Sequence, residues 1–331
     1  MLKDLQVTAN APWKRRYRLP MTYAAQIAAV MPERGLAVSN ISGVYQLFTW
    51  HVPSGELTKL TTRPEGVVWG SLSPTGTHVY YLEDQKGNEC GHFVRVPYTG
   101  GPTEDITPDL PFYSARECCF SRAGNRLSFT AATDEGFDLY CVDMNADASL
   151  SRPRKLCRCS GKTYPPQLSS HGEMAVITTA EGINGLNFHV VAIDAATGQE
   201  IAQLSDGEQS SLEALMFSPL DGDMRVLATT NRSGYKRPLL WNPRIGERSE
   251  LLVDELSGEV LPRDWSPDGL HILLCQFAEA VQHLYLYDLR RQALQPLHHP
   301  AGTFASLSER ICFGPGVILL LHGRTRRRPR S

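Results

Sequence analysis

Short apolar stretches of about six residues recur along most of this chain, and polar turns separate them. Examples are HVYYLE (78–83), RLSFTA (126–131), MAVITT (174–179) and HILLCQ (271–276). They are rich in β-branched, aromatic and leucine residues, and the 3.6-residue spacing of apolar positions expected of helices is nearly absent. The pattern therefore predicts an all-β protein.

A Ser-to-Gly turn precedes each of these stretches at a nearly constant interval. The variants SPTG, SRAG, SSHG, SPLDG and SPDG begin 48 or 49 residues apart, at Ser73, Ser121, Ser169, Ser218 and Ser266. A weaker earlier copy, MPERG, begins at Met31, and a final copy lies around Ser308. Proline, aspartate and glycine have ordinary structural reasons to occupy tight turns, so we interpret these turns as structural.

The residues between successive turns read as four strands joined by hairpins. A second strand such as LYCVDM (139–144) or LYLYDL (284–289) follows the first, and a glycine-bearing turn leads to a third. A fourth strand precedes the next Ser-to-Gly turn, and in a propeller this strand is the first strand of the next blade. Four antiparallel strands per repeat of about 40–50 residues are typical of a β-propeller blade. The sequence predicts a β-propeller in which each Ser-to-Gly turn joins the first and second strands of one blade.

The blade count follows from the number of repeats. Six units are readable between about residues 23 and 300, and a seventh begins at TFASLSERICF (303–313) but is cut short. We expect a seven-bladed propeller with an incomplete last blade, and six blades are the alternative. Because an incomplete blade exposes a sheet edge, we expect VILLL (317–321) to be buried or to drive association.

This reading divides the chain into four parts. Residues 1–22 form an N-terminal segment, 23–310 the propeller, 311–323 a strand-like remnant and 324–331 a basic, solvated tail.

Composition narrows the class of protein. The 331 residues carry a net charge of −2, which offers no general attraction for nucleic acid or an anionic membrane. The first 20 residues contain no apolar run typical of a secretory signal, and VILLL is too short to span a bilayer. Eight scattered cysteines fit free thiols in a reducing compartment. The sequence thus predicts a cytoplasmic protein.

The repeats and one later stretch resemble a known family. The pattern from SPDG to LYLYDL is similar to the N-terminal propeller of prolyl oligopeptidase-family serine peptidases, especially the acylaminoacyl-peptidase-like members, and to the propeller of TolB. PGVILLLHG (315–323) resembles an early strand of that family's α/β-hydrolase domain, which ends in an HGGP motif. His322 and Gly323 match its first two positions, and Arg324 departs from it. The resemblance implies that His322 and Gly323 are the remnant of an oxyanion-hole motif.

The rest of a serine-peptidase site is missing from these residues. Only Gly66/Gly70 and Gly87/Gly91 have the spacing of a G-x-S-x-G nucleophile elbow, and their central residues are Val68 and Glu89. Without a nucleophile no triad can be assembled, so we expect the chain to be inactive alone.

The resemblance implies a non-catalytic propeller that gates peptide access to a hydrolase domain. Its partner would be a peptide substrate or a separate hydrolase domain. The alternatives are a TolB-like cytoplasmic interaction scaffold and a metal-dependent propeller enzyme with acidic and amide side chains converging on the channel. No cofactor is indicated, and the oligomeric state stays open.

Two residue pairs were weighed as metal ligands. Cys157 and Cys159 alternate within KLCRCS, which places both on one face of a strand, but no second pair follows. His298 and His299 sit beside a turn without visible partners. We interpret the thiols as packed and the histidines as solvated, and predict no metal site.

Overall fold

The computed structural model describes residues 20–182, 187–299 and 311–314, the backbone of 319–320, and the isolated residues 8, 11 and 14. Every element in these residues is a β-strand. Among them no helix is long and apolar enough to cross a membrane.

The first three sheets each contain four antiparallel strands paired in chain order. Blade 1 comprises β1 (Thr22–Ile27), β2 (Arg34–Ser39), β3 (Gln46–His51) and β4 (Glu56–Lys59). Blade 2 comprises β5 (Ser71–Leu72), β6 (His78–Asp84), β7 (Gly91–Pro97) and β8 (Glu104–Asp105). Blade 3 comprises β9 (Cys119–Phe120), β10 (Arg126–Thr133), β11 (Gly136–Asp143) and β12 (Arg154–Cys159).

Three further four-stranded sheets and one two-stranded sheet complete the described strands. Blade 4 comprises β13 (Gln167–Leu168), β14 (Met174–Thr179), β15 (His189–Asp194) and β16 (Glu200–Leu204). Blade 5 comprises β17 (Leu212–Phe217), β18 (Val226–Thr230), β19 (Arg237–Asn242) and β20 (Glu247–Glu250). Blade 6 comprises β21 (Glu259–Trp265), β22 (His271–Ala278), β23 (Val281–Asp288) and β24 (Ala293–Pro296). The small sheet pairs β25 (Cys312–Phe313) with β26 (Leu319–Leu320).

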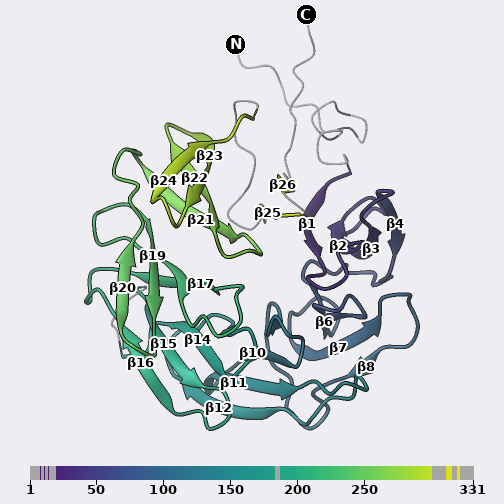
Figure 1. Cartoon of the computed structure of the whole chain (residues 1–331). Coiled ribbons are helices and arrows are strands. Elements are labelled where there is room, and N and C mark those ends of the chain that lie inside the picture. The colour runs from purple at the N-terminus through teal and green to yellow at the C-terminus, as the bar shows by residue number, and fades with distance from the viewer. Residues whose placement is uncertain are drawn as a thin grey trace, which may run out of the picture.

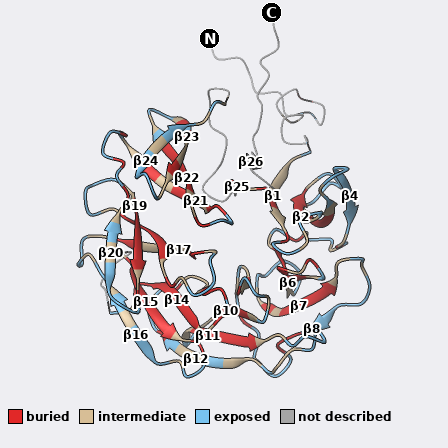
Figure 2. Ribbon diagram, in the orientation of Figure 1, coloured by how far each residue is buried: buried red, intermediate tan, exposed pale blue. Residues whose placement is uncertain are grey.

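The sheets are arranged around a central opening as the blades of a β-propeller, which confirms the predicted fold (Figure 1). The second and third strands of each blade are largely buried, whereas outer strands are exposed, as in β4 and β20 (Figure 2). This burial explains the sequence pattern, because strands covered on both faces read as nearly continuous apolar runs.

The described residues form six complete blades, the alternative count predicted from the sequence. The start of the expected seventh unit contributes the two-stranded sheet, seen in Figure 1 in the opening between β21 and β1. The backbone amide of Phe313 donates to Asp264 Oδ2 of blade 6 at 2.7 Å, which ties β25 to β21. The side chains of VILLL lie outside the described residues, so the expectation of their burial stays a prediction.

In three of the blades the innermost strand is shorter than the apolar pattern predicted. β5, β9 and β13 each have two residues, whereas the pattern suggested about six. Pro165 and Pro166 directly precede β13, and proline cannot donate to a strand ladder. Gly70 has the same position before β5, where its missing side chain allows close packing on Leu47.

The repeated turn serines have a shared structural role. Their side chains are almost fully buried, and four of the hydroxyls accept a hydrogen bond from the backbone amide five residues later. The donor–acceptor distance is 3.1 Å in blade 2 (His78 to Ser73) and 2.8 Å in blade 6 (His271 to Ser266). Gly269 of SPDG has φ +71°, which favours glycine. The turn is therefore structural, as expected.

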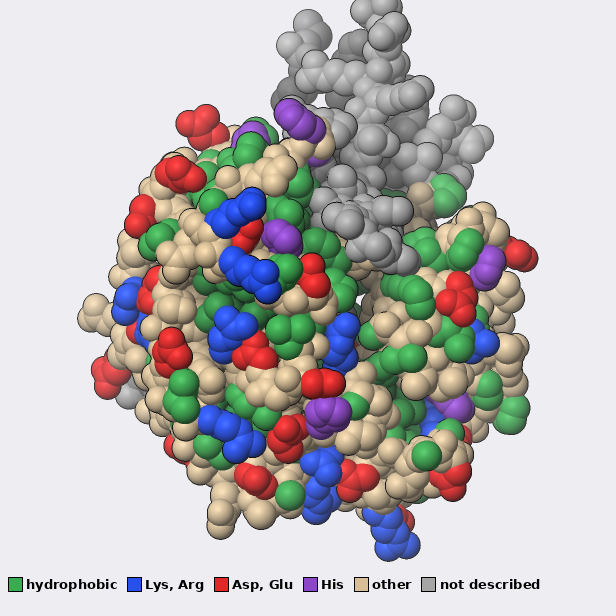
Figure 3. All heavy atoms as spheres, in the orientation of Figure 1, with side chains coloured by type: hydrophobic (Ala, Val, Ile, Leu, Met, Phe, Trp, Pro, Cys, Tyr) green, Lys and Arg blue, Asp and Glu red, His purple; other side chains and the backbone are tan. Residues whose placement is uncertain are grey.

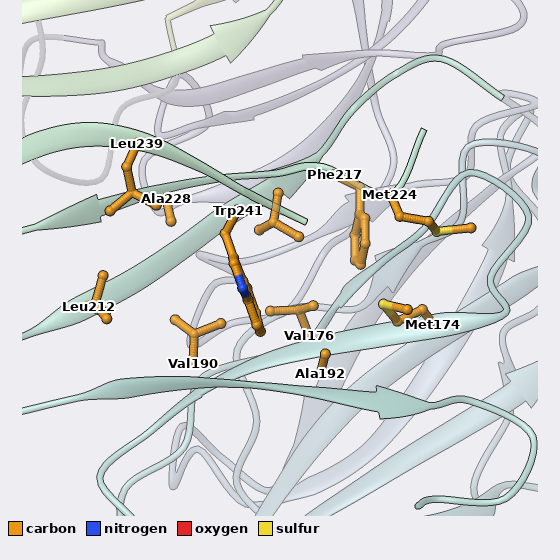
Figure 4. Packing of buried hydrophobic residues seen from close by; sticks show 11 residues of the cluster. Met174, Val176, Val190, Ala192, Leu212, Phe217, Met224, Ala228, Leu239 and Trp241 are labelled. Carbon is orange, nitrogen blue, oxygen red and sulfur yellow. The ribbon is translucent and has the colours of Figure 1, made fainter. Parts of the chain in front are cut away.

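The apolar core lies between neighbouring blades. Figure 4 shows the cluster between blades 4 and 5, in which Trp241 of β19 packs among Met174, Val176 and Val190 of blade 4. Similar clusters join each of the other consecutive blade pairs. Blades 2 to 5 are thus each stabilised by clusters with two neighbours, whereas blades 1 and 6 each share a cluster with one neighbouring blade.

The antiparallel strands divide the connections between two faces of the ring. The turn face consists of the Ser-to-Gly turns and the turns joining the third and fourth strands. The linker face consists of the turns joining the second and third strands and of the five linkers between blades, 60–70, 106–118, 160–166, 205–211 and 251–258. Figure 3 shows acidic and basic side chains interspersed around the open centre in one view.

Candidate functional site

The longest of the five linkers, 106–118, carries an exposed aromatic ring. Phe112 is 51% exposed, whereas Tyr113, the next residue of the linker, is buried. The linker is held in place by backbone hydrogen bonds between Tyr113 and Gly91, and between Ser114 and Ala132. These bonds fix Phe112 between the two blades, so its exposure is a property of an ordered segment.

A cavity of 590 Å³ lies on the blade 3 side of Phe112. The linker and the β10–β11 turn supply most of its wall. It is lined by Cys90, Leu110, Pro111, Phe112, Tyr113, Ser114, Ala131, Ala132, Thr133, Asp134, Glu135, Asp138, Tyr140 and Arg158. The wall therefore combines aromatic rings with three carboxylates and one guanidinium.

A second cavity of 720 Å³ lies on the blade 2 side of the same ring. It is more polar. Its lining consists of Arg63, Glu83, Asp84, Gln85, Lys86, Asn88, His92, Val94, Thr103, Asp105 and Phe112. Phe112 lines both cavities and so forms the ridge between them.

A stack of rings supports the ridge from inside. The His92 ring meets Phe112 edge-on at 4.7 Å between centroids and lies parallel to Tyr113 at 5.9 Å. Tyr113 stacks on Phe129, which stacks on Tyr140 at 5.3 Å. The Tyr113 hydroxyl accepts from the Phe93 amide, and burial raises its pKa, so it stays neutral. The rings of this stack thus pack against the Phe112 ring from the inner side, through His92.

An ion-pair network forms the polar floor of the first cavity. The Asp138 side chain is only 7% exposed and accepts from Arg158 Nε at 2.6 Å and Nη2 at 2.8 Å, and from Lys155 Nζ at 3.0 Å. Hydrogen bonds from Arg158 are the main reason why the pKa of Asp138 is lowered. Arg158 also donates to Glu135 at 2.5 Å. The Arg158 guanidinium in this cavity therefore makes a bidentate contact with the Asp138 carboxylate.

The sequence analysis did not identify the Phe112 ridge and its two cavities, because it drew its candidate residues from motifs. The signals available were the unusual length of linker 106–118 and the acidic DE turn at 134–135. His322 and Gly323, the predicted oxyanion remnant, lie outside the described residues, and their role stays a prediction.

The two cysteines of KLCRCS do share one face of β12, as expected. Cys159 is buried in a cluster with Leu139 and Ile177, and Cys157 packs at its edge. The Cys157 thiol and the hydroxyls of Thr163 and Thr179 hydrogen-bond to Cys159, which lowers its pKa.

The described residues contain no group of three or more His, Cys, Asp or Glu side chains placed to hold a metal ion. His299 Nε2 accepts from the Leu284 backbone amide at 3.1 Å, a contact that anchors the end of blade 6.

Comparison with known proteins identifies the fold. No family model matches the sequence, and no curated protein matches it. The structure is similar to an oligogalacturonate lyase from Vibrio parahaemolyticus, with a TM-score of 0.66 and 11% identity over 91% of this chain and 87% of that chain.

Two further similarities agree with the resemblances seen in the sequence. A prolyl endopeptidase matches with a TM-score of 0.64 and 12% identity over 86% of this chain. TolB from Acinetobacter baumannii matches with a TM-score of 0.50 and 14% identity over 86% of this chain. This chain spans 44% of the prolyl endopeptidase and 65% of TolB. At such identities these similarities establish a shared propeller domain.

Proposed function

We propose that this chain is the non-catalytic propeller domain of a prolyl-oligopeptidase-like serine peptidase. It governs which peptides reach the active site of a hydrolase domain that these 331 residues do not contain.

The proposal rests mainly on the PGVILLLHG stretch at 315–323, which follows the last complete blade after a segment of 18 residues. The propeller fold is shared by proteins of several activities, the oligogalacturonate lyase included, so the fold cannot choose among them. The stretch resembles a hydrolase strand at the position where a hydrolase domain would follow a propeller. The match to less than half of a prolyl endopeptidase supports the same reading.

The alternative is a scaffold that binds a protein without serving a peptidase. A second TolB-type protein, from Agrobacterium tumefaciens, matches over 80% of this chain and 91% of that chain, with a TM-score of 0.53. The match thus includes nearly all of that TolB-type protein, which favours the scaffold as the second candidate.

The first experiment measures catalysis by the purified chain. We expect no hydrolysis of acyl-amino-acid or dipeptide chromogenic substrates and no labelling by a fluorophosphonate probe, because acyl transfer needs an activated nucleophile. Labelling of one serine, with turnover lost on its replacement by alanine, would contradict the non-catalytic assignment.

The second experiment measures gating. Tagged chain is recovered from the cells that produce it, and co-eluting proteins are treated with the fluorophosphonate probe. We expect one labelled serine hydrolase, which the chain slows on a folded protein substrate much more than on a dipeptide. An equal effect on both substrates would refute gating, and elution without any labelled hydrolase would favour the scaffold.

A further inference from the structure

The two faces of the propeller differ in charge. The linkers and turns of the linker face contain 12 acidic and 6 basic residues, a net charge of −6. The corresponding loops of the turn face contain 6 of each, a net charge of zero. Carboxylates gathered on one face repel each other, and a cationic partner relieves that repulsion.

Many of the carboxylates on the linker face have no ion-pair partner within the described part of the chain. They are Glu65, Glu89, Asp134, Glu208, Asp254, Glu255 and Glu279. Asp134 lines the first cavity beside Phe112, and Glu89 lies next to residues that line both cavities. The acidic charge near the ridge is therefore available to a partner.

The linker face also carries more exposed apolar side chains than the turn face. Its loops expose Ile41, Val44, Val68, Phe112, Tyr235 and Leu252, whereas those of the turn face expose Val30, Leu220 and Ile245. Exposed apolar groups rimmed by polar ones are typical of interaction sites.

Three aromatic rings on the linker face, those of Trp69, Tyr164 and Tyr235, have a cation from the protein beside them. The Arg116 guanidinium lies over Trp69 at 5.5 Å, and Arg237 over Tyr235 at 5.8 Å. No described cation lies over Phe112, the ridge between the two cavities. Unlike Trp69 and Tyr235, the Phe112 ring therefore has no described guanidinium or ammonium group over it.

We propose that the linker face, centred on the Phe112 ridge, binds an extended peptide segment that carries arginine. A guanidinium stacks on the exposed ring, and the carboxylates of Asp134 and Glu89 attract the charge. The inference goes beyond the proposed function, because it concerns a surface of this chain alone and needs no hydrolase.

Charge and geometry together select arginine. The planar Arg158 group already lines the first cavity, where it pairs with the Asp138 carboxylate, and aromatic side chains line the same cavity. Guanidinium ions stack on rings and pair with carboxylates in the same plane, whereas an ammonium ion is a compact and strongly hydrated charge. Two cavities flanking one ring suit alternate side chains of an extended peptide.

The test measures binding of fluorescein-labelled octapeptides to the full chain by fluorescence anisotropy at about 0.02 M and about 0.15 M salt. The peptides are RARARARA, KAKAKAKA and QAQAQAQA. We expect the arginine peptide to bind at least fivefold more tightly than the lysine peptide. The glutamine peptide should not bind measurably, and salt should weaken the arginine complex.

Two variants and two matched controls locate the site. Phe112→Ala should weaken arginine-peptide binding about tenfold, as should Asp134→Asn combined with Glu89→Gln. On the turn face, Ile245→Ala and Glu33→Gln should leave binding unchanged. Thermal unfolding of each variant checks that it is folded.

Several results would overturn the proposal. These are the absence of arginine-peptide binding, equal binding of the glutamine peptide, or unchanged binding in both linker-face variants. Equal binding of the lysine peptide would overturn stacking on Phe112. None of these outcomes depends on whether a hydrolase partner exists, so they are separate from the gating experiment.

Discussion

Replacing Ile311 tests whether the segment after blade 6 is an integral part of the propeller. Its side chain is fully buried and packs on Leu273, Cys275 and Leu284 of blade 6. Ile311→Ala removes three carbon atoms, worth roughly 2.4 kcal/mol at about 0.8 kcal/mol each. With the term for the cavity left behind, we expect a loss of about 3 kcal/mol in the free energy of unfolding. That corresponds to a fall in Tm of about 4 °C for a domain of this size.

Scanning calorimetry and urea unfolding measure the effect, and two variants calibrate it. Ile311→Val should cost about 1 kcal/mol. Ile245→Ala makes the same change at a side chain that is 69% exposed and should cost almost nothing. If the segment instead detaches before the propeller unfolds, Ile311→Ala will have the wild-type Tm and only faster local hydrogen exchange. That result would refute the reasoning, because the segment would then be an appendage.

Two further predictions concern buried titratable groups. Asp138→Asn should cost about 2 kcal/mol near neutral pH, less than a fully buried pair because Arg158 is partly exposed. Because the pKa of Asp138 is lowered in the folded protein, this loss in the free energy of unfolding should be fully present above about pH 4. It should shrink as the pH falls through the lowered pKa of Asp138 in the folded protein. Urea unfolding of both proteins at several pH values measures it. Burial raises the pKa of Cys118 and that of Cys141, the latter to about 11, so iodoacetamide at pH 8 should modify Cys90 well before either. Peptide mapping that finds all three modified at equal rates would contradict the described burial.

The architecture was predictable because its determinants are local and repeated. Four of the turn serines bind the backbone amide five residues later, so the turn is specified by a handful of adjacent residues. The alternation of buried and exposed strands follows from which strands neighbouring blades cover. The lengths of β5 and β13 were less predictable, because proline or glycine beside the strand limits its pairing.

The Phe112 ridge was not predictable in the same way. Its parts come from linker 106–118, the turn at 134–135 and β12, and only the pairing of strands brings them together. The exposure of Phe112 depends on contacts with both neighbouring blades, which no local pattern reports. The charge difference between the two faces also depends on the strand boundaries, because four of the six net negative charges lie in the linkers between blades.

The near-constant interval between turn serines has a consequence for how such a chain can change in length. Each blade contacts mainly the blades next to it along the chain, and the Ser-to-Gly turns of adjacent blades meet through contacts such as the Ala123 amide donating to the Ser170 carbonyl. Unequal recombination between two repeats adds or removes one whole blade while every remaining turn keeps the same local sequence and the same kind of neighbour. Gain or loss of a 48-residue unit thus changes the circumference of the ring in single steps, whereas an insertion of any other length must lie in a linker or a hairpin turn if the sheets are to stay intact.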